Sequence, residues 1–364
     1  MEKINFYNDR ELQHSSFHEV RKYGHRYQDF ENEKLLKEVH YEVEISCKTR
    51  NTYNDFVFEI DRKQVYIDNE EPSLLVEQML DKCAKAIFPI RIIPADDGTI
   101  SEIDNHEEII QRWRSLKKHL GSYYYSDVAY KILNKVQQLI LNKVELKRSL
   151  NKDWFFHLYF SPLYINYPLD VPQIYLWKSP ILGNQSVDYK VNHVVEEYYT
   201  STDKIIINAK GKSIDERSIE EVLKGIDYPK AKLQGMDYKT LESEMEVQYK
   251  LYGEDRSIFS IISTYETKIN NTKKKVQKIA LFHLVEDENF RPDSDLEVRK
   301  AHEQFQNFQT MGDEDIIDIS ERLKGFKHIS NSEESSEKIS LFVEEIPTLQ
   351  RKTSLEKFLG MFKK

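Results

Sequence analysis

The sequence is poor in cysteine, glycine and proline, and each shortage excludes a class of protein. Two cysteines, Cys47 and Cys83, cannot build the framework of a disulfide-rich secreted domain, and neither belongs to a Cys-x-x-Cys pair. We expect both to be reduced thiols, one on a strand and one on a helix. The 364 residues include only 11 glycines and 10 prolines, and 39% are hydrophobic, which excludes a collagen-like or wholly disordered chain. We therefore expect a sizeable core, in one large or two ordinary domains.

Long apolar runs are also missing. Residues 158–174 are interrupted by Ser, Asn, Asp and three prolines, whereas a membrane span needs about 18 or more apolar residues in succession. The first residues, Met1-Glu2-Lys3-Ile4, lack the basic and apolar regions of an export signal. We therefore expect no transmembrane segment and a cytoplasmic location. The abundance of Lys, Ile, Asn, Tyr and Glu is a compositional habit of low-GC bacteria and suggests a bacterial source.

An excess of basic residues is absent, which argues against general nucleic-acid binding. The net charge is −9, whereas a protein that grips phosphate backbones is normally basic. Residues 286–345 hold 17 acidic and 7 basic side chains, so the acidity belongs to this segment. Within it, residues 330–337 contain no apolar side chain, a composition typical of disorder. We predict a disordered acidic tail over residues 311–364.

The last residues change character and predict a short, basic, amphipathic helix at the end of this tail. Leu355, Phe358, Leu359 and Phe362 recur at i, i+3, i+4 and i+7, behind the N-cap residue Ser354. A helix of about ten residues is marginal alone, since isolated helices shorter than ~12–15 residues rarely form. It therefore needs a surface to pack on, either on a partner or on its own domain.

Hydrophobic periodicity predicts an α+β fold of curved antiparallel sheets with covering helices. In the first half it predicts strands at residues 41–46, 56–60 and 65–67, helices at 74–87, 105–120 and 128–144, and a hairpin at 90–103. In the second half it predicts strands at residues 187–199, 205–209, 241–251, 258–269 and 275–284, and helices at 219–223 and 297–308. Gly98 should supply the positive φ of the hairpin turn, and Asn105 with Glu108 should form a capping box. Two similar units are an alternative that no residue-level repeat supports.

These elements divide the chain into four predicted parts. Residues 1–37 are an N-terminal arm, 38–180 an α+β domain with a helical hairpin, 181–310 an antiparallel β-rich domain, and 311–364 the acidic linker and terminal helix. Before the boundary at 180 lies a tract of Trp, Phe, Tyr and Pro, a mixture that should not continue a helix. Rings at this density usually fill a core. The alternative is a platform for a partner, which would include Trp154, Tyr159 and Trp177.

The short motifs of common enzymes are missing. Gly211-Lys212-Ser213 lacks the earlier glycine of a phosphate-binding loop, because position 206 is Ile. His106-Glu107-Glu108 lacks the second histidine of a zinc site. The acidic residues 293, 295 and 297 lack the glycine and the closing glutamate of a calcium loop. We predict no catalytic, cofactor-binding or metal-binding residues.

Three functional hypotheses remain, each from a different class. The leading one is a non-catalytic adaptor or assembly subunit that binds a protein partner through Leu355, Phe358, Leu359 and Phe362, with the aromatic platform as a second contact. The alternative is a carrier that holds a small apolar ligand within a curved sheet covered by helices. The second alternative is an enzyme of an unrecognised family, because a site assembled from distant loops need not leave a short motif.

Overall fold

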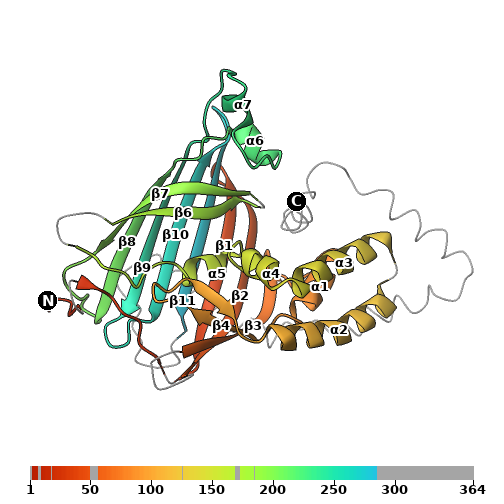
Figure 1. The fold of residues 1–364 in the computed structure, drawn as a ribbon, viewed down its shortest axis with the longest axis horizontal. Helices are drawn as coiled ribbons and strands as arrows, with labels where there is room; N and C mark the ends of the chain where they lie inside the picture. The colour runs from red at the N-terminus through yellow and green to blue at the C-terminus, as the bar shows by residue number, and fades with distance from the viewer. Residues whose placement is uncertain are drawn as a thin grey trace, which may run out of the picture.

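One antiparallel sheet of 11 strands dominates the fold (Figure 1). The computed structural model describes residues 2–6, 10–17, 19–49, 56–124, 126–168, 173–183 and 185–284. The strands are β1 (Arg21–Glu31), β2 (Lys34–Thr49), β3 (Phe56–Ile67), β4 (Ile90–Pro94), β5 (Ile100–Ile103), β6 (Gln173–Leu182), β7 (Gln185–Val195), β8 (Lys204–Ser213), β9 (Ser243–Tyr252), β10 (Ile258–Lys268) and β11 (Lys274–His283). The helices are α1 (Leu75–Ala84), α2 (His106–Tyr123), α3 (Asp127–Leu141), α4 (Lys143–Leu150), α5 (Trp154–Tyr159), α6 (Ile219–Leu223) and α7 (Lys230–Leu233).

The order of the strands places the first and the last strand side by side at the centre of the sheet. The order is β5-β4-β3-β2-β1-β11-β10-β9-β8-β7-β6, so β1 pairs with β11, from Tyr23 opposite His283 to Glu31 opposite Lys275. β5 and β6 follow one another along the chain but form opposite edges of the sheet. The segment between them carries α2–α5 and runs from one edge to the other.

Alternating burial explains why these segments form strands of a sheet with one covered face. In β7, Val187, Tyr189, Val191, His193 and Val195 are buried, and the residues that alternate with them are more exposed. A pleated strand turns successive side chains to opposite faces, so such a pattern buries one face only. β9 follows the same alternation from Ser243 to Tyr249, and β10 from Ile261 to Lys268. The buried face of the sheet is the one that curves around α5 (Figure 1).

Helix α5 fills the hollow of this curved sheet. Its residues from 155 to 159 are all buried. The Tyr159 ring lies edge-on to that of Tyr23 in β1, with 5.7 Å between centroids, and the Trp154 ring lies 4.8 Å from that of Tyr265 in β10. The prediction that the aromatic tract fills a core is therefore confirmed. The prediction that the tract forms no helix was wrong, because Asp153 caps a six-residue helix ahead of the first proline.

Most predicted elements are confirmed. The helices predicted at 74–87, 105–120 and 219–223 correspond to α1, α2 and α6, and the five strands predicted beyond residue 187 correspond to β7–β11. The hairpin is present as β4–β5, with Gly98 at φ +94°. The capping box does not form, because the Asn105 side chain accepts the Arg91 N–H and donates to the Pro89 carbonyl instead. The helix predicted at 128–144 divides at Asn142, which caps α4.

The predicted N-terminal arm and domain division differ from the structure. Residues 21–31 form β1, a central strand rather than an arm. The boundary at 180 falls inside β6, and strands from both predicted domains share one sheet through the pairing of β1 with β11. The segments 56–60 and 65–67 are one strand, β3. The strands therefore form a single sheet and not the two similar units that the sequence left as an alternative. The predictions for residues 297–308 and 311–364 lie outside the described residues.

Candidate functional site

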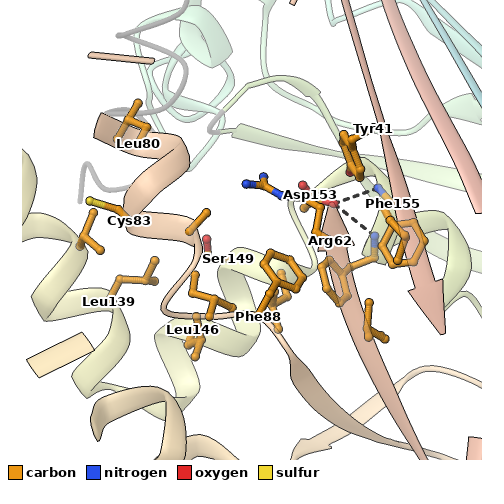
Figure 2. Close-up of a pocket in the computed structure, with 17 residues that line it drawn as sticks. Tyr41, Arg62, Leu80, Cys83, Phe88, Leu139, Leu146, Ser149, Asp153 and Phe155 are labelled. Carbon is orange, nitrogen blue, oxygen red and sulfur yellow. Dashed lines mark hydrogen bonds between the residues drawn. The ribbon is translucent and has the colours of Figure 1, made fainter. Parts of the chain in front are cut away.

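An apolar pocket of about 120 Å³ lies between the helical segment and the β2–β3 part of the sheet (Figure 2). Its apolar lining consists of Val43, Ile60, Leu80, Cys83, Ala84, Ile87, Phe88, Val136, Leu139, Leu146, Leu150, Phe155 and Phe156. Four further side chains, those of Tyr41, Arg62, Ser149 and Asp153, bring polar groups to its wall. These residues come from β2, β3, α1, α3, α4 and α5 and from the segments next to α1 and α5, so the pocket exists only when the helices pack on the sheet.

The amphipathic pattern of the helices creates the apolar wall. α3 buries Ile132, Leu133, Val136 and Ile140 at three- and four-residue steps, which places them on one helical face. Ser126 and Asn142 cap α3 and α4 and set where each helix begins. The apolar faces of α1, α3 and α4 therefore cover this margin of the sheet, while their polar faces meet solvent.

Asp153 is the buried carboxyl group of the pocket. It accepts hydrogen bonds from the backbone N–H groups of Phe155 at 2.9 Å and Phe156 at 3.3 Å, and so caps α5. Burial raises the pKa of Asp153, against the opposing effect of these N–H groups and of Arg62. Burial also raises the pKa of Tyr41 well above its usual value. The pocket wall thus favours the neutral forms of both groups.

Arg62 lies where the pocket meets a second, polar hollow of about 240 Å³. This hollow is lined by Asp61, Arg62, Lys63, Gln64, Asp81, Lys85 and Phe88. The Arg62 guanidinium donates to Asp81 Oδ1 at 2.7 Å. Its central carbon lies 5.8 Å from the centroid of the Tyr41 ring and 5.3 Å from that of Phe88. The two rings and the carboxylate hold the cation at the boundary between the apolar and the polar space.

Cys83 and His25 are the other side chains at this site that could act as a nucleophile or as an acid or base. Burial raises the pKa of the Cys83 thiol to about 12, so it is not an activated nucleophile. His25 lies behind the pocket wall, with its ring stacked on that of Tyr41 at 4.5 Å between centroids. Burial lowers its pKa to about 3. Neither ring nitrogen has a hydrogen-bond partner among the described residues, so His25 is a neutral core residue.

The site residues predicted from the sequence do not line this pocket. Tyr159 and Trp177 are only 5% and 7% exposed, and Trp154 is partly buried and packed against the core. The predicted partner platform is therefore corrected to a core cluster, since α5 turns these rings toward the interior of the sheet. Leu355, Phe358, Leu359 and Phe362 lie outside the described residues.

The motifs that lacked a chemical partner in the sequence have structural roles. Gly211 lies within β8, where a Cβ atom would come within 2.7 Å of Val191 Cγ2. His106 begins α2, and its Nε2 lies 2.8 Å from the Ile140 carbonyl oxygen. His283, a lone histidine in the apolar strand β11, also has a structural partner, because its Nδ1 lies 2.5 Å from the Tyr252 hydroxyl oxygen. In the part of the chain that the structure describes, no group of three or more His, Cys, Asp or Glu side chains could hold a metal ion. No helix of that part is both long and apolar enough to span a membrane.

Comparison with known proteins shows no family. No protein-family model matches the chain, and no curated protein matches it. Among solved structures it is similar to a chain of lipovitellin, in a study of lipid–protein interactions in that protein, with a TM-score of 0.35 and 12% sequence identity. The match covers 73% of this chain and 25% of the lipovitellin chain, so the chain spans about a quarter of the length of its structural neighbour. A similarity of this strength assigns neither a fold nor a ligand.

Proposed function

We propose that the protein binds a small apolar molecule, or the apolar end of a larger one, in the pocket beneath α1, α3 and α4. The pocket itself is the observation that carries this proposal. All but four of its 17 lining residues are apolar, and they come from both the helices and the sheet. A concave apolar site with a few polar groups is the usual form of a small-molecule site.

The size of the pocket limits the occupant. A volume of about 120 Å³ is close to that of an engineered apolar cavity of about 150 Å³ that binds benzene. Sites for whole drug-sized ligands span roughly 300–1,000 Å³. The pocket therefore suits one ring or a short alkyl chain. The rest of a longer ligand would have to lie in the polar hollow next to it.

The lining of the pocket favours an apolar occupant. Such a ligand would gain dispersion contacts with the lining and would remove apolar surface from water. Filling an apolar space of about 120 Å³ contributes at most roughly 3 kcal/mol, at about 24 cal/mol per Å³.

This proposal is a form of the carrier hypothesis, with a different location. The hollow of the curved sheet is filled by α5, so the site lies at the margin of the sheet, under the covering helices. The adaptor hypothesis depends on residues 355–362, which lie outside the described residues, and it stays a prediction.

Calorimetric titration of the protein with 1-octanol tests the proposal. Ala84 lines the pocket and lies on α1, so Ala84→Leu adds bulk to the pocket without lowering helix propensity much. Ala280→Leu is the matched control, because Ala280 alternates with the buried Ile279 and Leu281 of β11 and does not line the pocket. We expect the wild type and Ala280→Leu to bind 1-octanol equally, and Ala84→Leu to bind it at least about tenfold more weakly, since its side chain occupies the same volume.

Equal binding by Ala84→Leu and the wild type would place the ligand elsewhere and refute the proposal. A circular dichroism spectrum of each variant controls for loss of fold. Native mass spectrometry of freshly purified protein adds a second readout, because a retained ligand appears as extra mass that Ala84→Leu should lose.

A further inference from the structure

The apolar pocket and the polar hollow share two lining residues, Arg62 and Phe88. The apolar space therefore continues directly into a space lined by charged side chains. A purely apolar ligand would use only the first of them. A ligand that uses both has an apolar end and a polar end, and the side chains of the hollow decide which polar group it carries.

Basic groups are the ones still available in the hollow. Lys63 is already paired with Asp61 at 2.8 Å and with Glu44 at 2.7 Å. Lys85 is exposed, and no ion pair joins it to any residue that the structure describes. Asp61 and Asp81, the acidic side chains of the hollow, are each engaged with a basic neighbour. A negatively charged group would thus meet unused donors there, whereas a cation would have to compete for carboxylates that are already paired.

Arg62 also has N–H donors that its bond to Asp81 does not use. A guanidinium carries five N–H donors, and Asp81 accepts from one of its Nη atoms. A carboxylate in the hollow could accept from the Nη donors that Asp81 does not use. It would form a charge-assisted bond with a cation that two rings already hold in place.

The apolar wall determines the direction in which such a ligand lies. A carboxylate placed deep in the pocket would lose its hydration against side chains that offer it no hydrogen-bond donor. The same carboxylate beside Arg62 meets the polar hollow, which shares Arg62 and Phe88 with the pocket. The lining therefore favours the chain inside and the head at Arg62.

We propose that the ligand is an amphipathic anion, with a short apolar chain in the pocket and a carboxylate bound by Arg62, close to Lys85. This inference rests on the proposed function, because it names the chemical class of the ligand for the same site. The head group is set by Arg62 and the polar hollow, and the chain by the pocket under α1, α3 and α4.

Three octyl compounds with different head groups test the inference. Octanoate, 1-octanol and octyltrimethylammonium share one chain and carry a negative, a neutral and a positive head. Each is titrated calorimetrically into the full chain, below the concentration at which it forms micelles. We expect octanoate to bind about ten- to a hundredfold more tightly than 1-octanol, as a charge-assisted hydrogen bond predicts. Octyltrimethylammonium should bind most weakly, and added salt should weaken only the binding of octanoate.

Two variants assign the preference to residues. Arg62→Gln should abolish the preference for octanoate over 1-octanol, measured as the ratio of their dissociation constants in the same variant. Because Arg62 also pairs with Asp81, Lys85→Gln provides a second variant at an exposed position, and it should weaken octanoate binding severalfold. Lys190→Gln, at an exposed lysine of β7, is the matched control and should bind all three compounds as the wild type does.

The outcomes separate this inference from the proposed function. If 1-octanol binds the wild type as tightly as octanoate does, or if the ammonium compound binds most tightly, the anionic ligand is refuted and the apolar site stands. An unchanged preference in both Arg62→Gln and Lys85→Gln also refutes it. If none of the three compounds binds, the proposed function itself fails.

Discussion

Replacement of Asp153 separates two effects that meet at one carboxyl group, the cap of α5 and the burial of a charge. Asp153→Asn keeps a good N-cap and removes the charge. Asp153→Ala removes both, and leaves the N–H groups of Phe155 and Phe156 without their acceptor. Loss of an N-cap costs about 0.5–2 kcal/mol. Because both N–H groups belong to buried residues, we expect the upper end, about 2 kcal/mol less free energy of unfolding for Asp153→Ala than for Asp153→Asn.

The dependence on pH tests the burial of the charge. Burial raises the pKa of Asp153 in the folded protein above its unfolded value, so the folded state binds the proton more tightly. Above the folded pKa, the buried charge of Asp153 therefore lowers the free energy of unfolding. This destabilisation disappears as the pH falls to the pKa of Asp153 in the unfolded chain. Asp153→Asn should therefore be at least as stable as the wild type at pH 7, and the difference between them should shrink at about pH 4.5.

Urea denaturation at both pH values, followed by tryptophan fluorescence, measures these differences. Equal stability of Asp153→Ala and Asp153→Asn at pH 7 would show that the cap does not stabilise α5. An Asp153→Asn protein less stable than the wild type at pH 7 would show that the charged form is favoured, and would refute the argument from burial.

Two further predictions concern buried charge elsewhere in the fold. Arg217→Ala leaves Asp215, which it binds at 2.6 and 2.9 Å in a buried pair, without its partner. This change should lower the free energy of unfolding by about 3–5 kcal/mol. Lys224→Ala, at an exposed position of the same segment between β8 and β9, should change it by less than about 0.5 kcal/mol. His25 has a folded pKa lowered to about 3, so its contribution to stability is present above the unfolded pKa and is lost as the pH falls. His25→Phe should remove up to roughly 3 kcal/mol of the stability change between about pH 6.5 and 4. Urea titrations check both predictions, and an unchanged pH slope in His25→Phe would contradict the second.

Elements with a clean local pattern could be predicted from the sequence. The short helix at 219–223 has the predicted limits. The structure shows a capping box of Ser218 and Glu221 at its start, a signal that acts over only three residues. β10 and β11 lie within one residue of their predicted limits, since their apolar residues alternate and short turns separate them. The α+β class and the antiparallel arrangement follow from such segments.

Other elements could not be predicted, because their burial depends on distant partners. β1 turns Arg21, His25 and Asp29 to the covered face. Its buried positions are therefore partly polar, and the sequence lacks the alternation of apolar and polar residues that predicts a strand. Arg21 is acceptable there because Asp255, far along the chain, lies 2.6 Å from its guanidinium, and the neighbouring Ser257 also accepts a hydrogen bond from it. α5 has almost no polar face, and its helical form depends on the sheet that surrounds it.

The sequence by itself determined most of the segments that become helices and strands, with β1 and α5 as exceptions, because capping residues, turn residues and periodicity act over a few neighbouring positions. The tertiary structure alone decided the order of the strands, the pairing of β1 with β11 and the position of the helices on the sheet. The candidate site belongs to this second class. Arg62 comes from β3 and Asp153 from the start of α5, and they share a pocket wall only because α1, α3 and α4 cover that margin of the sheet. A site built by packing between distant segments has no characteristic residue spacing, so the sequence could not predict it.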